Sequence, residues 1–254
     1  MISQESIKQL ATRYRTSELN VIREYFQHVF LAELYKLPGA GKLLFKGGTA
    51  LRIVYGSPRF SEDLDFSLFG IYAHEQKKYV EDLFNAVLVT IERGGIHVVI
   101  HSKSDATSGG YWGAANFQLY DYQPVEVAIN ISSRNGREVH GEVETIANDF
   151  IPTYNLLHLP KEELVDEKIF GALLERQKER DFYDLYFMLR KGMLSSEQKN
   201  RLATVKEQIL AGAQTKDFRR ELGVFLPADL QAIIGDFQRA LRDELNRQTS
   251  EVLS

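Results

Sequence analysis

Apolar residues recur along this chain with two different periods, and the changes of period mark the expected elements. Residues 17–35 and 74–93 place apolar side chains three and four positions apart, which is the spacing of a helix with one buried face. Residues 63–69 and 125–131 alternate polar and apolar positions, as a half-buried strand does. We therefore expect a mixed sheet of about four to six strands within residues 42–145, with helices flanking it.

The second half of the chain has mainly the helical period. Four stretches carry an apolar stripe at helical spacing: residues 161–175, 181–191, 195–211 and 228–245. Asp181 begins a new helix or bends the preceding one. Residues 152–160 begin and end with proline, so we expect them to connect the two halves. The fold class is accordingly α/β (α+β), with an α/β domain over residues 1–150 and a helical domain over residues 151–254.

The composition is that of an ordinary globular protein. Of the 254 residues, 44% are hydrophobic and 26% are charged, and no apolar run is long enough to cross a bilayer. The absence of cysteine excludes disulfides and thiolate metal sites. The N-terminal residues lack the apolar core of a secretory signal, so we expect a cytoplasmic location and no membrane partner. A net charge of −4 argues against a surface coated with positive charge for general nucleic-acid binding.

A glycine pair separates an apolar strand from a helical run. Gly47 and Gly48 follow residues 43–46, and Thr49 opens a stretch with helical spacing. Glycines at this position let the backbone come close to a ligand, and the N–H groups at a helix start attract phosphate oxygens. A glycine pair before a helix is more often only a turn, so this feature alone predicts little.

Two aspartates follow shortly afterwards. Asp63 and Asp65 are two residues apart in the strand 63–69, so their side chains leave the same face. Two carboxylates on one face repel each other and attract a hard cation such as Mg²⁺ or Mn²⁺, which also binds substrate phosphates. A single Asp-x-Asp is usually a solvated strand edge, but its place after the glycine pair points to nucleotidyl or phosphoryl transfer.

The order of these features carries a family resemblance. Lys46-Gly-Gly-Thr-Ala-Leu-Arg52, followed by Arg59-Phe-Ser-Glu-Asp-Leu-Asp-Phe66, closely resembles the AbiEii/AbiGii toxin family of bacterial nucleotidyltransferase-like proteins. Lys168, Arg176 and the run Arg180-Asp-Phe-Tyr-Asp-Leu-Tyr186 resemble the downstream motif of the same family. The resemblance extends from about Thr16 to Arg190. It implies a nucleotidyltransferase-like mixed sheet flanked by helices, with the helical C-terminal half closing a nucleotide cleft.

The resemblance also assigns roles to the downstream residues. Lys168, Arg176 and Arg180 are expected to neutralise a triphosphate, while Asp184 orients an arginine. On one continuous helix Arg176, Arg180 and Asp184 would stack four residues apart. The alternative is an ordinary series of ion pairs, each worth about 0.3–0.5 kcal/mol. Arg52 and Arg59 could likewise meet phosphates or cover acidic surface.

The third carboxylate of the family is uncertain in this sequence. The superfamily usually supplies it from a strand such as residues 125–131, where Glu126, Ala128 and Asn130 share one face. The usual acidic position falls nearest Ala128, and Glu126 is displaced by one same-face step, roughly 6.6 Å along a strand. Glu126 is therefore either the third catalytic acid or a plain edge-strand charge.

The resemblance implies a Mg²⁺-dependent enzyme that transfers a nucleoside monophosphate from an NTP to an acceptor hydroxyl. Gly47, Gly48 and Thr49 would position the phosphates, and Asp63 and Asp65 would bind the metal. It also implies an RNA acceptor, possibly tRNA, and a toxin of a bacterial toxin–antitoxin or phage-defence pair with a separately encoded antitoxin. The alternatives are a non-catalytic relative that binds nucleotide or a protein partner, and a small-molecule nucleotidyltransferase of the aminoglycoside-modifying kind.

Overall fold

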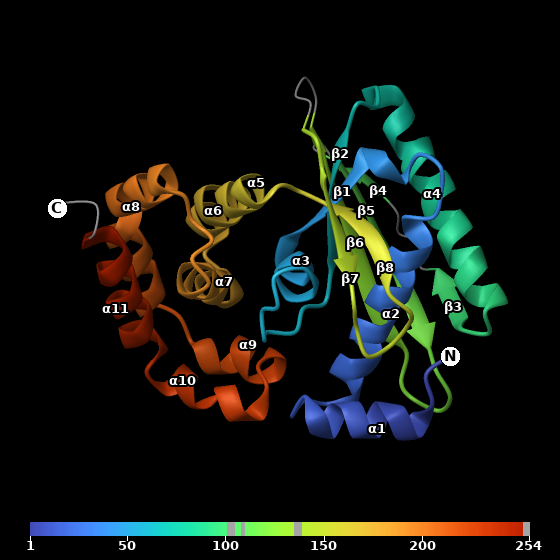
Figure 1. Ribbon diagram of the computed structural model, residues 1–254, viewed down its shortest axis with the longest axis horizontal. Coiled ribbons are helices and arrows are strands. Elements are labelled where there is room, and N and C mark those ends of the chain that lie inside the picture. Colours follow the sequence, from blue (N-terminus) through green and yellow to red (C-terminus); the bar gives the residue numbers. More distant parts are fainter. Residues whose placement is uncertain (101–104, 108–109, 135–138, 251–254) are drawn as a thin grey trace. The chain divides into compact units, whose positions relative to one another are not determined.

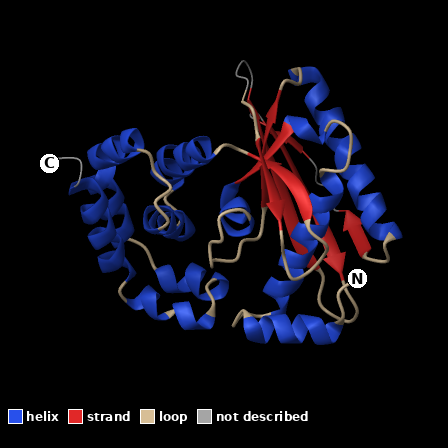
Figure 2. Ribbon diagram, in the orientation of Figure 1, coloured by secondary structure: helices blue, strands red, loops and turns tan. Residues whose placement is uncertain are grey.

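The computed structural model describes residues 1–100, 105–107, 110–134 and 139–250 (Figures 1 and 2). Its contacts group the chain into two compact units. The N-terminal unit comprises Met1–Gly56 and Phe60–Leu159, and the C-terminal unit comprises Ser57–Arg59 and the chain from Pro160 onward. The chain thus enters the C-terminal unit for three residues, returns to the N-terminal unit, and leaves it again after Leu159.

The N-terminal unit is built on a mixed sheet. The strands are β1 (Leu43–Lys46), β2 (Leu64–Phe69), β3 (His97–Ile100), β4 (Asp105–Thr107), β5 (Gly110–Gln118), β6 (Val125–Arg134), β7 (Glu142–Ile146) and β8 (Tyr154–His158). Seven of them follow the order β3-β5-β6-β2-β1-β8-β7, and β4 pairs with β5. The β2–β6 and β1–β8 pairs are parallel, and the other pairs are antiparallel. The expected fold class, a nucleotidyltransferase-like mixed sheet with flanking helices, is confirmed.

Two expectations about the sheet were wrong. It has more than the expected four to six strands, and β8 lies within residues 152–160, which were expected to be only a connector. Tyr154, Leu156 and His158 are buried alternately, which is the period of a strand. This alternation is not a clear strand signal in the sequence, because the run is short and is flanked by prolines. The pairing of β8 with β1, which is distant in sequence, depends on tertiary contacts.

Four helices accompany this sheet: α1 (Gln4–Arg13), α2 (Glu18–Leu34), α3 (Gly47–Ile53) and α4 (Ala73–Arg93). The helices predicted over residues 17–35 and 74–93 are confirmed. Ser17 caps α2 by accepting a hydrogen bond from the Asn20 N–H, which satisfies one of the free donors of the first turn. Figure 1 shows α2 and α4 along one face of the sheet and α3 on the other.

Aromatic packing fills the face that α2 and α4 cover. Phe45 and Phe66 are paired across β1 and β2, with ring centroids 5.6 Å apart. Phe66 also packs on Phe84 of α4, and Phe84 packs on Phe30 of α2. Since successive strand residues point to opposite faces, the neighbours of Phe66 are directed to the side where α3 lies. Asp65 is one of these neighbours.

The C-terminal unit is helical. Its elements are α5 (Lys161–Asp166), a π-helical turn at Glu167–Leu173, α6 (Leu174–Arg176), α7 (Glu179–Arg190), α8 (Ser196–Gln214), α9 (Phe218–Phe225), α10 (Ala232–Gly235) and α11 (Phe237–Ser250), with a short 3₁₀ turn at Ala228–Leu230. Phe182, Phe218 and Phe237 form its aromatic centre, and the last two rings are 4.6 Å apart. Within the described residues, no helix combines the length and the apolarity that a bilayer crossing requires.

A buried histidine makes the stability of the N-terminal unit depend on pH. His28 of α2 is almost fully buried, with Nδ1 2.8 Å from the Tyr154 hydroxyl. Burial, assisted by the nearby charge of Arg52, lowers the pKa of His28 to about 3. The unfolded chain binds this proton near pH 6.5, whereas the folded chain does not, so acid favours unfolding.

We expect the free energy of unfolding to fall by about 2 kcal/mol more in the parent protein than in His28→Gln between about pH 7.5 and about pH 5, because only the parent carries this proton linkage. Urea unfolding curves of both proteins at the two pH values measure the difference. Parallel pH dependence in the two proteins would show that His28 does not titrate in this way.

Candidate active site

The turn between β1 and α3 lies directly against a carboxylate of β2. Gly47 has a φ of +83°, a left-handed conformation that glycine adopts at little cost. A Cβ added to Gly47 would lie 2.1 Å from Oδ2 of Asp65, which is far inside van der Waals contact. The preceding residue, Lys46, is the cross-strand partner of Asp65 in the antiparallel β1–β2 pair. The glycine turn and the second aspartate of the motif therefore converge in space.

A hydrogen bond ties the start of α3 to the first aspartate. Thr49 is fully buried, and its hydroxyl donates to the backbone oxygen of Asp63. The Thr49 hydroxyl thus donates its proton within the protein. This hydrogen bond connects the residue that precedes β2 to the first turn of α3. Gly47 and Gly48 are the first two residues of this helix, so their N–H groups have no acceptor within it.

The two aspartates of the motif lie at the start of β2. Asp63 immediately precedes β2 and Asp65 is its second residue, so both side chains are directed to the same face. Both residues are half-buried. Two carboxylates on one face fit Mg²⁺ or Mn²⁺, which keep several ligand positions for water and phosphate oxygens.

Asn130 is a member of this site that sequence reasoning missed. In the parallel β2–β6 pair, Asn130 is the partner of Asp65, and its Nδ2 donates to Asp65 Oδ1 over 3.1 Å. Lys46, Asp65 and Asn130 form a row across three adjacent strands, which we call the Asp65 row. The alternation of residues 125–131 shows that Asn130 shares a face with Glu126, but only the strand register shows which of them meets Asp65.

The structure does not bring Glu126 to Asp65. Glu126 is exposed, pairs with Asn116 of β5, and lies four residues from Asn130, which is roughly 13 Å along a strand. In the part of the chain that the structure describes, no group of three or more His, Cys, Asp or Glu side chains is placed to hold a metal. The donor set that the register assembles is therefore two carboxylates and one neutral amide.

The C-terminal unit has a buried charge cluster of its own. Asp184 of α7 is 1% exposed and accepts hydrogen bonds from Arg59 Nε and Nη2 on Oδ1, at 3.0 and 2.7 Å, and from Lys168 Nζ on Oδ2, at 2.7 Å. Burial alone would raise the pKa of Asp184, but the charges and hydrogen bonds of Arg59 and Lys168 outweigh it and hold the pKa below its ordinary value. The arginine that donates to Asp184 is Arg59, which is not part of the expected stripe of Arg176 and Arg180.

The expected stripe of Arg176, Arg180 and Asp184 on one helix does not form. Gln177 has a φ of +48° and separates α6 from α7, so the residues on its two sides do not share a helical face. Arg176 instead makes a bidentate pair with Asp181, at 2.7 and 2.9 Å, and Arg180 lies 3.6 Å from Glu221. Arg176, Arg180 and Asp184 have helical spacing in the sequence. The left-handed backbone of Gln177 ends the helix after Arg176, so the three side chains do not form one stripe.

The two arginines around the glycine motif cover acidic groups. Arg52 pairs with Glu24 of α2 through two hydrogen bonds of 2.8 and 2.9 Å, and its guanidinium lies 3.6 Å from the ring centre of Phe60. Arg59 is the partner of Asp184, as described above. The sequence left open whether Arg52 and Arg59 meet phosphates or cover acidic surface. In the structure, both side chains contact carboxylates.

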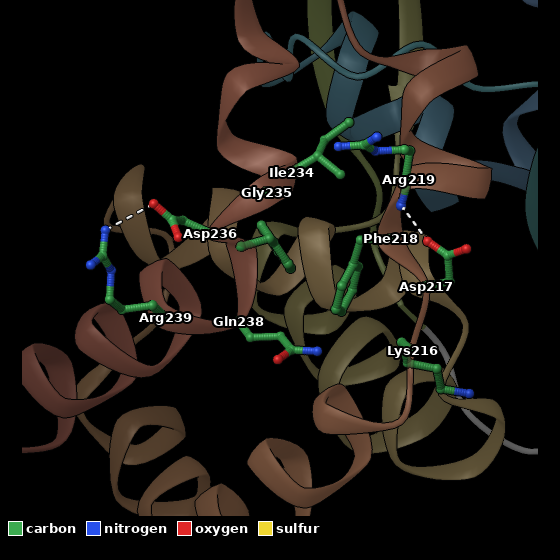
Figure 3. Close-up of a pocket in the computed structure, with 10 residues that line it drawn as sticks. Lys216, Asp217, Phe218, Arg219, Ile234, Gly235, Asp236, Gln238 and Arg239 are labelled. Atoms are coloured by element: carbon green, nitrogen blue, oxygen red, sulfur yellow. Dashed lines mark hydrogen bonds and ion pairs between the residues drawn. The ribbon is translucent and has the colours of Figure 1, made fainter.

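A separate cavity of about 360 Å³ lies within the C-terminal unit (Figure 3). It is bordered by the segments that begin α9 and α11: Lys216, Asp217, Phe218, Arg219, Ile234, Gly235, Asp236, Phe237, Gln238 and Arg239. The figure shows Asp236 paired with Arg239 and the N–H of Arg219 donating to Asp217. No residue that the sequence assigned to a site borders this cavity.

Comparison with known proteins supplies a family and a fold. A family model described as "Nucleotidyl transferase AbiEii toxin, Type IV TA system" matches residues 29–252. A crystal structure from H. pylori, described as a "putative nucleotidyltransferase", is 20% identical with a TM-score of 0.64, over 93% of this chain and 97% of that one. JHP933 from Helicobacter pylori is also 20% identical, with a TM-score of 0.58, over 94% and 98% of the two chains. A search of curated proteins gives no match.

The approach of Gly47 to Asp65 gives a prediction about stability. Gly47→Ala should cost about 1–2 kcal/mol for its left-handed backbone and about 1–3 kcal/mol more for displacing Asp65. Gly56→Ala is the matched control, because Gly56 has a φ of +76° but nothing within 4 Å of an added Cβ. Urea unfolding of both variants separates the two costs, and equal losses of stability would contradict the close approach.

The buried cluster around Asp184 gives a further prediction about stability. Asp184→Asn removes the negative charge that two buried cations share, and we expect a loss of about 3–5 kcal/mol in the free energy of unfolding. Asp236→Asn breaks an exposed pair, in which Asp236 and Arg239 are 70% and 71% exposed, and should cost at most about 1 kcal/mol. Chemical unfolding followed by circular dichroism compares the two; a small loss in Asp184→Asn would mean that the cluster contributes little net stability.

Proposed function

Because the chain belongs to the AbiEii family of nucleotidyl transferase toxins of type IV toxin–antitoxin systems, we propose that it transfers a nucleoside monophosphate from an NTP to an acceptor hydroxyl. The observation that carries the proposal is the convergence of the Gly47 turn and the Asp65 carboxylate, with Asp63 two residues earlier on the same face. This places a helix start, which favours phosphate, beside two carboxylates, which favour a divalent cation.

The chain's own groups divide the work as follows. The glycine turn lets the backbone N–H groups of Gly47 and Gly48 approach phosphate oxygens without a side chain in between. Asp63 and Asp65 hold Mg²⁺ or Mn²⁺, which, when bound, neutralises charge on the phosphates. The acceptor hydroxyl gives up its proton to solvent water, and its oxygen forms a bond to the α-phosphorus. The bond from that phosphorus to the α–β bridging oxygen breaks, and pyrophosphate leaves. Preorganised positioning and charge, rather than a covalent intermediate, supply the rate enhancement.

The finer parts of the proposal concern substrates and partners. The acceptor is RNA, with tRNA as the first candidate, and the cognate antitoxin is a separately encoded protein. Lys168, Arg176 and Arg180 are proposed triphosphate contacts, and phage defence and a cytoplasmic location belong to the same proposal. In their resting contacts Lys168, Arg176 and Arg180 each face a carboxylate, so a triphosphate has to compete for them.

A second candidate is a nucleotide-binding protein without transfer activity. The observation that favours it is the neutral Asn130 beside Asp65, where an additional carboxylate would complete a metal-binding trio. The two candidates share the phosphate and metal contacts, so they differ in whether label from the nucleotide becomes covalently attached to an acceptor.

The test is transfer of label from α-³²P-labelled NTPs, each in turn, to total RNA in the presence of Mg²⁺ or Mn²⁺. We expect transfer by the parent protein and a loss of about 10²-fold or more in Asp63→Ala and Asp65→Ala, because each removes a charge aimed at the reacting phosphate. Glu144→Ala, an exposed acid on β7, is the control and should retain activity.

Expression in bacteria gives an independent measurement, since the parent should arrest growth and Asp65→Ala should not. Nucleotide binding without any labelled product, for every NTP and both metals, would favour the second candidate. Absence of both binding and transfer would remove the proposal.

A further inference from the structure

The Asp65 carboxylate is held from two sides by different parts of the fold. Its Oδ1 accepts a hydrogen bond of 3.1 Å from the Asn130 amide on β6. Its Oδ2 is the atom that an added Cβ on Gly47 would meet at 2.1 Å. Oδ1 therefore faces the Asn130 amide on β6, and Oδ2 faces the glycine turn. These two contacts restrict the rotation of the carboxylate about its Cβ–Cγ bond.

The chemical type of residue 130 affects Asp65 because the strand register places the two residues side by side. Asp65 and Asn130 are direct partners in the parallel β2–β6 pair, so their side chains share one face and are adjacent. An amide at this position donates a proton and carries no charge. An aspartate there would set a second carboxylate against Asp65, and the two would repel unless a cation lay between them.

We propose that Asn130 is a positioning residue for the metal-binding carboxylate of Asp65. By donating to Oδ1 it orients the carboxylate for a divalent cation, and, being neutral, it adds no charge to the site. The inference deepens the proposed function and depends on it, since it concerns the cation that the same site takes up. Hydrogen-bond partners of metal ligands typically affect metal affinity about 10–100-fold.

The chain offers a matched control on the same strand. Ser133 of β6 donates to Gln76 of α4 over 2.6 Å, so Ser133→Ala also removes one side-chain hydrogen bond from β6. Residues 130 and 133 are three apart on a strand, and their side chains therefore point to opposite faces. A general loss of packing in β6 would affect both variants, whereas a loss of Asp65 orientation would affect only the change at residue 130.

The experiment measures Mn²⁺ binding to the full chain by isothermal titration calorimetry, without nucleotide. Asn130→Ala should weaken Mn²⁺ binding about tenfold. Asn130→Asp should tighten it about tenfold, because the cation then neutralises a third carboxylate. Ser133→Ala should bind Mn²⁺ as the parent does. In transfer assays, the metal concentration for half-maximal rate should shift in the same directions, while the KM for NTP stays unchanged.

The outcomes separate the inference from the proposed function. Unchanged Mn²⁺ affinity in Asn130→Ala or in Asn130→Asp, with binding abolished in Asp65→Ala, overturns the role of Asn130 and leaves the transferase proposal standing. Equal weakening in Asn130→Ala and Ser133→Ala also overturns it, since the effect is then one of strand packing. No Mn²⁺ binding and no transfer by the parent protein removes the proposed function itself.

Discussion

The site depends on one close approach, that of the Gly47 backbone to the Asp65 carboxylate. The approach requires a residue without a Cβ and with a positive φ, and both conditions are met at the first position of α3. It also requires the register in which Lys46 of β1 faces Asp65 of β2. A shift of one residue in either strand would turn Asp65 toward the aromatic core, where an unpaired carboxylate is costly. Sheet register and glycine placement therefore act together.

The C-terminal unit is organised around a different constraint, the burial of charge. Asp184 is surrounded by protein, and its ionised form persists because Arg59 and Lys168 both donate to it. Arg59 reaches this cluster through a three-residue excursion of the chain between α3 and β2, four residues before Asp63. The loop that precedes Asp63 and Asp65 is thus anchored by a buried ion pair, and removing one partner of a buried pair costs more than removing one partner of a surface pair.

The two carboxylates and one amide of the site bear on which activity is expected of this family member. Two carboxylates and an amide carry less negative charge than three carboxylates, so under the proposed function a divalent cation would depend more on the phosphates of the nucleotide. Glu126, exposed and four residues away on β6, adds nothing to the Asp65 row in this register. Lys168, Arg176 and Arg180 are each held by a carboxylate, so a phosphate group proposed to bind there would compete with that carboxylate.

Local periodicity was enough to predict the helices at residues 17–35 and 74–93 and the strands at residues 63–69 and 125–131, because each of these is set by neighbours in the chain. The mixed sheet and the meaning of the motif from Gly47 to Asp65 came from the family resemblance. Strand β8, the Asp65–Asn130 contact and the Arg59–Asp184 pair could not be obtained in this way. Their partners are distant in sequence, and which of several same-face residues meet is decided by strand register. The left-handed Gln177, which breaks the predicted cationic stripe, has no signal in the alternation of apolar and polar positions. Residue types and their spacing thus determined which chemistry the chain could carry, and the packing of remote segments decided which side chains lie together to perform it.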